Sequence, residues 1–195
     1  MKKTGKIFFI SGPSGVGKGT LIGELKKKYP EWEFPPSCTT REPRPGEVDG
    51  ETYFFISKEE FKQKIEEGEF LEYAVVHGGN MYGTLKKLLL EPIKKGKIVI
   101  REFDVQGFEQ AKEILDPSDF SSIFLKPVEP VEELVKRIKE RAPISEDEIN
   151  KRIESMEKEL KKSEIYDYYI FSEGGKIEKL VKDAEEIIEE ILKES

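Results

Sequence analysis

The feature that most constrains the fold is a glycine-rich segment near the start of the chain, GPSGVGKGT at residues 12–20. The apolar run KIFFIS (6–11) comes directly before it, and Leu21, Ile22 and Leu25 follow it at helical spacing. A buried strand, a glycine loop and a helix in this order are typical of an α/β unit. Further apolar runs alternate with helical patterns along the chain. We therefore predict a parallel sheet with helices on both faces.

The glycine loop carries the pattern G-x-x-x-x-G-K, from Gly12 to Lys18, between a strand and a helix. Small residues let successive backbone N–H groups turn inward around a phosphate, and the following helix N-terminus attracts the same anion. Lys18 adds a positive charge for the β and γ phosphates. The loop predicts a bound nucleoside triphosphate, with Mg²⁺ implied. Its candidate ligands are Gly12, Pro13, Ser14, Gly15, Val16, Gly17, Lys18, Gly19 and Thr20.

Composition excludes several classes of protein. The chain has 195 residues and a net charge of −7, which argues against broad binding to nucleic acid or anionic membranes. Cys38 is the single cysteine, so an intrachain disulfide and a cysteine metal cluster are both excluded. No apolar run approaches membrane-spanning length. We expect one compact domain that acts in the cytoplasm.

The character of the sequence changes after Phe34, where prolines and short strand patterns appear. ETYFFIS and EFLEYAVVHG look like strands, and SKEEFKQKIEEG (57–68) has the Ser and Glu of a capped helix. The strand pattern GKIVIREFDVQG (96–107) then resumes the main sheet. We therefore predict a core of about residues 1–33 and 96–195 with a small α+β lobe inserted at about 34–95.

The inserted segment SCTTREPRPGEVDGETYFF (37–55) is the most informative stretch for the substrate. Arg41 and Arg44 flank Pro43, and two guanidinium groups held there can grip one phosphate dianion. Ser37 and Tyr53 can add neutral hydrogen bonds. The alternative is a solvated loop of arginines and prolines.

Together with the glycine loop, the stretches SCTTREPRPGEVDG, GEFLEYAVVHG, MYGT, DVQG and YDY resemble the guanylate kinase family, in order, from about residue 6 to 190. The resemblance implies a P-loop NTPase-type core that binds ATP and an inserted lobe that binds GMP. It implies Mg²⁺-dependent transfer of the γ-phosphoryl group to GMP, and we extend this to dGMP. It also implies a helical lid at about 130–160, whose pattern is two helices broken at Pro143.

The resemblance also assigns roles to individual residues. Those that match the contacts of the GMP phosphate are Ser37, Arg41, Arg44, Tyr53 and Tyr82. Those that match the guanine contacts are Glu72, Thr84 and Asp104. The expected catalytic cations are Lys18, Arg41, Arg44, Arg137, Arg141 and Arg152. The chemistry of guanine supports the second set, because one carboxylate can accept its adjacent N1–H and N2–H donors, whereas adenine has an acceptor at N1.

Asp104 is expected to end a strand, at the sheet edge where doubly wound folds bind ligands, with Glu102 two residues earlier on the same face. Thr20, Glu102 and Asp104 are the candidate Mg²⁺ contacts, directly or through water. Ser172 and Glu173 replace the Asn-Asp that the family commonly has near the adenine.

The expected partners are ATP and GMP alone, without nucleic acid or membrane, in a monomer or homodimer. Two alternatives remain open at this stage. One is a non-catalytic interaction module with the same fold, and the other is a P-loop kinase for a different phosphorylated acceptor.

Overall fold

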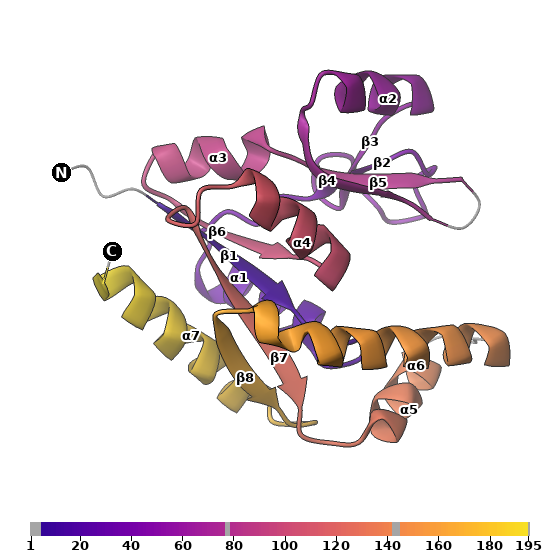
Figure 1. The fold of residues 1–195 in the computed structure, drawn as a ribbon, viewed down its shortest axis with the longest axis vertical. Helices are drawn as coiled ribbons and strands as arrows, with labels where there is room; N and C mark the ends of the chain where they lie inside the picture. Colours follow the sequence, from indigo (N-terminus) through magenta and orange to yellow (C-terminus); the bar gives the residue numbers. More distant parts are fainter. Residues whose placement is uncertain (1–4, 77–78, 142–144, 195) are drawn as a thin grey trace. The chain divides into compact units, whose positions relative to one another are not determined.

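The structure is a computed structural model that describes residues 5–76, 79–141 and 145–194 (Figure 1). Within these residues the strands form two sheets of four. The first sheet has the strand order β6-β1-β7-β8, and its members are β1 (Lys6–Ser11), β6 (Ile98–Glu102), β7 (Phe120–Pro127) and β8 (Tyr168–Ser172). The second has the order β3-β2-β5-β4, and its members are β2 (Ser37–Thr39), β3 (Tyr53–Phe55), β4 (Phe70–Val75) and β5 (Met81–Leu85).

Helices follow each strand of the first sheet, and two strands of the second sheet, β3 and β5, are also followed by a helix. They are α1 (Lys18–Lys28), α2 (Lys58–Glu66), α3 (Lys87–Lys94), α4 (Val105–Ile114), α5 (Val131–Arg141), α6 (Glu146–Lys161) and α7 (Ile177–Glu194), with a 3₁₀ turn η1 (Lys162–Ile165). The first sheet is parallel and has helices on both sides, which confirms the predicted α/β fold. No helix in the described part of the chain is long and apolar enough to cross a membrane.

The chain divides into two compact units. Unit 1 comprises the described parts of residues 1–7, 31–101 and 106–120, and unit 2 those of residues 8–30, 102–105 and 121–195. The glycine loop therefore belongs to unit 2, and the Arg/Pro segment belongs to unit 1. The boundaries of the predicted inserted lobe, at about residues 34 and 95, stay a prediction.

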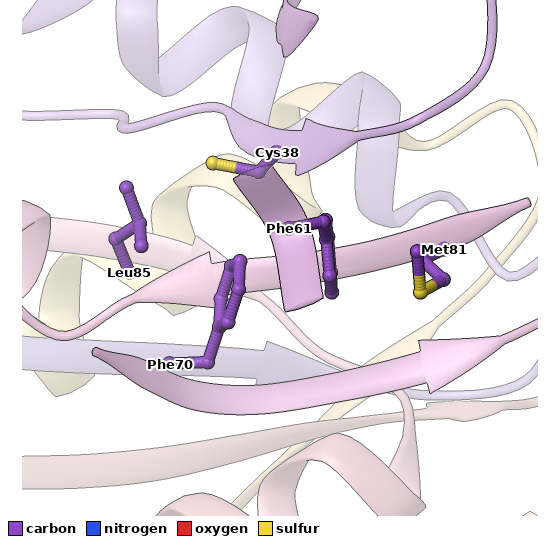
Figure 2. Packing of buried hydrophobic residues seen from close by; sticks show 5 residues of the cluster. All are labelled: Cys38, Phe61, Phe70, Met81 and Leu85. Atoms are coloured by element: carbon purple, nitrogen blue, oxygen red, sulfur yellow. The ribbon is translucent and has the colours of Figure 1, made fainter. Parts of the chain in front are cut away.

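Unit 1 is built around the second sheet and α2. Cys38, Phe61, Phe70, Met81 and Leu85 form its buried cluster (Figure 2). The rings of Phe61 and Phe70 stack with their centroids 4.3 Å apart, which joins α2 to β4. The predicted cap of α2 is confirmed, since the Ser57 hydroxyl accepts the Glu60 N–H at 3.0 Å. Such a cap stabilises a helix by about 1 kcal/mol. The cluster includes residues of β2 and β5, and both strands also carry candidate site residues.

Unit 2 holds the fully buried residues Phe8 to Ile10 of β1 and the terminal helix α7, which packs against β8 and α1. The buried residues of α7 are Leu180, Ala184, Ile188 and Ile191, at helical spacing, as the amphipathic pattern of the sequence predicts. A separate cluster of Leu134, Ile138 and Met156 joins α5 to α6. Strand β1 ends at Ser11, directly before the glycine loop.

The structure corrects part of the strand prediction for residues 96–107. Strand β6 ends at Glu102, and α4 begins at Val105. Asp104 thus lies in the connection, directly before the helix, a position that aspartate favours. Strand alternation therefore does not place it on the face of Glu102. The sequence patterns also missed β2, β5 and α3, and the predicted break at Pro143 lies outside the described residues.

Candidate functional site

The glycine loop in unit 2 adopts a conformation that its glycines make possible. Gly12, Gly15 and Gly17 have φ angles of 145°, 84° and 109°, in a region that L side chains rarely adopt. A Cβ on Gly12 would also lie 2.7 Å from the carbonyl oxygen of Leu125. The loop ends at Lys18, the first residue of α1. The predicted strand, loop and helix are therefore present in the order that phosphate binding requires.

The Lys18 ammonium lies against the loop itself. It donates hydrogen bonds to the carbonyl oxygens of Gly12 and Pro13, at 2.5 and 3.2 Å. It also lies 3.8 Å from a carboxylate oxygen of Glu102, and its side chain is only 14% exposed. The positive charge is thus concentrated at the glycine loop, beside one of the predicted metal contacts.

A hydrogen bond from Ser172, a residue that the sequence relates only to the adenine, holds the glycine loop. The buried Ser172 hydroxyl on β8 donates to the Val16 carbonyl at 2.6 Å. Residues 172–175 and Arg137 line a cavity of about 150 Å³ together with Gly15, Gly17 and Thr20. The cavity adjoins the glycine loop, as a site for the base of a nucleoside triphosphate would.

The candidate lid arginines have different surroundings. Arg137 donates to Glu129 at 2.7 Å, and the same carboxylate oxygen accepts the Gly174 N–H. Burial raises the pKa of Glu129, but hydrogen bonds from Gly174 and Arg137 outweigh it and hold the pKa below its ordinary value. Arg152 pairs with Glu148 one turn away on α6, at 2.6 Å. Arg141 is the last residue of α5, and its side chain lies outside the described part.

The predicted metal contacts are Thr20 in α1, Glu102 at the end of β6, and Asp104. Among the described residues, no group of three or more His, Cys, Asp or Glu side chains could hold a metal ion. Sequence reasoning missed one carboxylate of unit 2, Glu159 on α6. The pKa of Glu159 is raised above its ordinary value, chiefly by burial. A hydrogen bond from Ser155 and the charge of Lys18 lower this pKa, whereas the charge of Asp104 raises it. Glu159 therefore lies within electrostatic reach of Lys18 and Asp104.

In unit 1 the two candidate phosphate arginines are held differently. The Arg41 guanidinium donates to both carboxylate oxygens of Glu47 at 2.9 Å and to the Tyr82 hydroxyl at 3.1 Å. Its centre lies 5.5 Å from the Tyr53 ring. Glu47 also accepts the backbone N–H of Arg44 at 2.7 Å, whereas the Arg44 guanidinium makes no hydrogen bond to another described residue. Arg41 is thus fixed in place, and Arg44 presents an exposed fork.

These contacts set the charge states of the pair. The Arg41 hydrogen bond, followed by that from the Arg44 N–H, lowers the pKa of Glu47 below its ordinary value. The hydrogen bonds to Glu47 and Tyr82 raise the pKa of Arg41. Glu47 was not among the predicted site residues. Its place three residues after Arg44 gave a signal, because an acidic residue so close to two arginines is a natural ion-pair partner.

The candidate guanine contacts of unit 1 lie side by side. Glu72 on β4 is paired with Thr84 on β5, and the Thr84 hydroxyl donates to a Glu72 carboxylate oxygen at 2.6 Å. Arg101 on β6 donates to the Thr84 oxygen at 2.7 Å and also to the Ser37 hydroxyl. The structure thus brings Ser37, Glu72 and Thr84 together through Arg101, which sequence reasoning missed. Asp104 belongs to unit 2, so its predicted contact with guanine stays a prediction.

The first strand of a parallel sheet with helices on both sides leads through left-handed glycines and a lysine into a helix. This arrangement defines a P-loop nucleotide-binding protein of the α/β class. Comparisons with known proteins agree and are more specific. The family model "Guanylate kinase" matches residues 4–191. The chain belongs to the guanylate kinase family.

Individual relatives support this assignment. Guanylate kinase of Clostridioides difficile strain 630 is 47% identical over 174 residues, which cover 89% of this chain and 83% of that protein. Guanylate kinase of Clostridium tetani is 44% identical, with coverages of 96% and 85%. The crystal structure of guanylate kinase from Anaplasma phagocytophilum superposes with a TM-score of 0.73 at 30% identity, covering 96% of this chain and 86% of that one. The predicted family and enzyme class are confirmed, and neither alternative is favoured.

Proposed function

We propose that the chain transfers the γ-phosphoryl group of ATP to GMP, giving ADP and GDP, with Mg²⁺ bound to the phosphates. One observation carries the choice of acceptor. Arg44, with its exposed guanidinium fork, and Glu72 both belong to unit 1, whereas the P-loop belongs to unit 2. A second phosphate site with its own acceptor for base N–H donors is what a nucleoside monophosphate kinase for guanine requires.

The nucleoside triphosphate is proposed to bind to unit 2. The backbone N–H groups of residues 12–20 and the start of α1 hold its phosphates, and Lys18 neutralises the β and γ groups. When the Lys18 ammonium turns toward a phosphate, contacts with charged oxygens replace its hydrogen bonds to the carbonyls of Gly12 and Pro13. The cavity lined by Arg137 and residues 172–175 receives the adenine end.

The phosphate of GMP is proposed to bind mainly to Arg44. Arg41 already gives two N–H groups to Glu47, one to Tyr82 and one to the Glu42 carbonyl. A guanidinium has five N–H donors, so Arg41 keeps one for a phosphate. Arg44 has its complete fork available for a bidentate contact. Arg41 then contributes one hydrogen bond and its charge, with Tyr53 and Tyr82 beside it.

Guanine is proposed to bind to Glu72. A carboxylate has about four lone-pair sites, and Thr84 occupies one of them. The carboxylate oxygens of Glu72 are proposed to accept N1–H and N2–H from the base in addition. An adenine ring would bring its N1 lone pair against the same carboxylate, which is repulsive.

The residues of unit 2 fit Mg²⁺. This ion keeps several waters and is commonly held by one or two carboxylates together with substrate phosphates. Glu102 beside Lys18, with Thr20 and Asp104 as the other candidates, offers such a sparse oxygen set. When bound, Mg²⁺ would neutralise charge on the phosphates.

The chemistry then needs alignment rather than a general base, because the GMP phosphate is already ionised at neutral pH. Lys18, Arg41, Arg44, Arg137 and Arg152 are proposed to offset the repulsion between the two phosphates, with Arg141 as a further candidate. Exclusion of water by lid residues 130–160 would prevent hydrolysis. Since its substrates are nucleotides of the cell interior, we propose the cytoplasm as the place of action.

A coupled assay of ADP release tests the proposal. Wild-type protein receives ATP and Mg²⁺ with GMP, dGMP, AMP, CMP or UMP. We expect rapid ADP release with GMP and dGMP and at least ~10³-fold lower kcat/KM with the others. Equal rates with all acceptors, or none with GMP, would contradict the proposed function.

A further inference from the structure

Arg101 connects the candidate phosphate and guanine contacts of unit 1. It lies on β6, where apolar residues come before it, and its side chain is partly buried. One terminal nitrogen donates to the Pro35 carbonyl at 2.8 Å. The other donates to the Thr84 hydroxyl oxygen at 2.7 Å and to the Ser37 hydroxyl. A single guanidinium therefore holds the hydroxyl groups of two different strands.

A guanidinium can donate hydrogen bonds but cannot accept them, and each hydroxyl has only one proton. The Thr84 oxygen must therefore accept from Arg101, and its own proton goes to Glu72, 2.6 Å away. The Ser37 oxygen also accepts from Arg101, so its proton has to point away from Arg101. Arg101 thus fixes the directions in which the hydroxyl protons of Ser37 and Thr84 point.

We infer that Arg101 is a positioning residue that determines base specificity, an inference that rests on the proposed GMP site. By its contacts Arg101 makes Ser37 a donor toward the ligand and turns the Thr84 proton toward Glu72, which as a carboxylate only accepts. Guanine and its phosphate need this polarity, since O6 and the phosphate oxygens accept while N1–H and N2–H donate. Adenine has the reverse order at N6 and N1. The Thr84 proton is committed to Glu72, so Thr84 has no proton left to donate to O6.

The test replaces Arg101 by residues that differ in donor capacity. Arg101→Met keeps a similar length without any donor, and Arg101→Lys keeps a charge and donors only. Arg101→Gln introduces an acceptor. We expect KM for GMP to rise about 10- to 100-fold in the Met and Gln variants, and by less in Lys, while KM for ATP changes less than about twofold. The ratio of the inhibition constant of AMP to KM for GMP should fall in the Arg101→Met and Arg101→Gln variants but not in the Arg101→Lys variant.

These readouts separate specificity from stability. KM does not depend on how much of the enzyme is folded, so partial misfolding lowers only the apparent kcat. Lys97→Met is the matched control, because Lys97 lies just before β6 in an exposed ion pair with Glu33. We expect this variant to retain wild-type KM values for both nucleotides.

Two outcomes would overturn the inference. In the first, Arg101→Met keeps KM for GMP within twofold of wild type. In the second, GMP and AMP weaken in parallel in all three variants, which is what a merely structural contact with Pro35 would produce. If Arg101→Met does not fold, the contrast between Lys and Gln decides in the same way. Failure of the wild-type protein to phosphorylate GMP would instead contradict the proposed function.

Discussion

The glycine loop of unit 2 and the arginine cluster of unit 1, formed by Arg41 and Arg44, differ in the donors that they offer to a phosphate. In the loop, the donors are backbone N–H groups, and the conformation depends on glycines such as Gly12 with a φ of 145°. In the cluster, the donors are side chains, and Glu47 holds Arg41 in place with two hydrogen bonds of 2.9 Å. Phosphates are alike in every nucleotide, so backbone donors do not distinguish one nucleotide from another, whereas side-chain donors can be placed to match one ligand.

The two kinds of donor differ in how far they can select one nucleotide over another. A backbone loop recognises the phosphates of any nucleoside triphosphate, so its single essential side chain is Lys18. The arginine cluster and the hydrogen-bonded residues from Arg101 to Glu72 are proposed to recognise both a phosphate and a base. Side-chain changes in unit 1 should therefore alter the choice of acceptor, and side-chain changes in the loop should alter turnover.

The largest effect is expected for Lys18→Met. Because Lys18 supplies the positive charge at the loop, turnover should fall by roughly 100-fold or more while the fold and the affinity for GMP are retained. Turnover is measured in the coupled assay and folding by circular dichroism. Lys26→Met, an exposed lysine in the last turn of α1, should behave like wild type. Near wild-type turnover of a folded Lys18→Met protein would refute the role of the loop in catalysis.

The second largest effect is expected for Glu72→Gln in unit 1. The amide keeps the size of the carboxylate but replaces one acceptor by a donor, which leaves a guanine N–H without its partner. Loss of a hydrogen bond of this kind costs about 2–3 kcal/mol, or roughly 30- to 150-fold in kcat/KM for GMP. AMP should lose less, because it presents an acceptor at N1. Glu66→Gln on the exposed side of α2 is the control, and a parallel loss for both nucleotides would place guanine recognition elsewhere.

Arg44→Lys is expected to have a smaller effect on the same ligand. Lysine keeps the charge but loses the planar fork, so bidentate contact with the GMP phosphate is no longer possible. The Kd for GMP, measured by calorimetry, should rise about tenfold, equivalent to ~1.4 kcal/mol. An unchanged Kd would show that Arg44 does not hold the phosphate.

The smallest effect concerns Cys38, which lies between candidate site residues but faces the core of unit 1 (Figure 2). Burial raises the pKa of the Cys38 thiol to about 11, from an ordinary value of 9.0. The thiolate fraction at pH 8 is then about 100-fold lower than in an exposed cysteine, so a thiol reagent should react slowly until the protein unfolds. The rate of release of a chromogenic leaving group measures this. Reaction in the folded state as fast as in denaturant would contradict the packing of the cluster.

The sequence predicted the loop well because its determinants are local. A strand, glycines at fixed spacing and a lysine all lie within residues 6–20, and the structure has them as β1, the loop and α1. The α2 helix was also predictable from its Ser57 cap. By contrast, β2 is only three residues long and lies in a segment rich in proline and arginine, where no periodicity could develop. The α3 helix contains Pro92, which argues against a helix in any sequence pattern.

The candidate acceptor site was predictable only in part for a related reason. Arg41 and Arg44 stand close together in sequence, so their pairing could be proposed. Arg101 lies 64 residues from Ser37 and 17 from Thr84, and a single arginine after an apolar run gives no signal of what it contacts. The contact depends on how β6 lies relative to β2 and β5, which no local pattern specifies.

A calorimetric titration of two variants with two ligands tests whether the acceptor is chosen by unit 1 independently of the glycine loop. Lys18→Met and Glu72→Gln each receive GMP and, separately, a non-hydrolysable ATP analogue with Mg²⁺. We predict that Glu72→Gln binds GMP roughly 30- to 150-fold more weakly and the ATP analogue within twofold of wild type. Lys18→Met should show the opposite pattern, with GMP affinity unchanged. Weakening of both ligands to the same degree in either variant would contradict the claim that the acceptor is chosen by side chains of unit 1 independently of the loop.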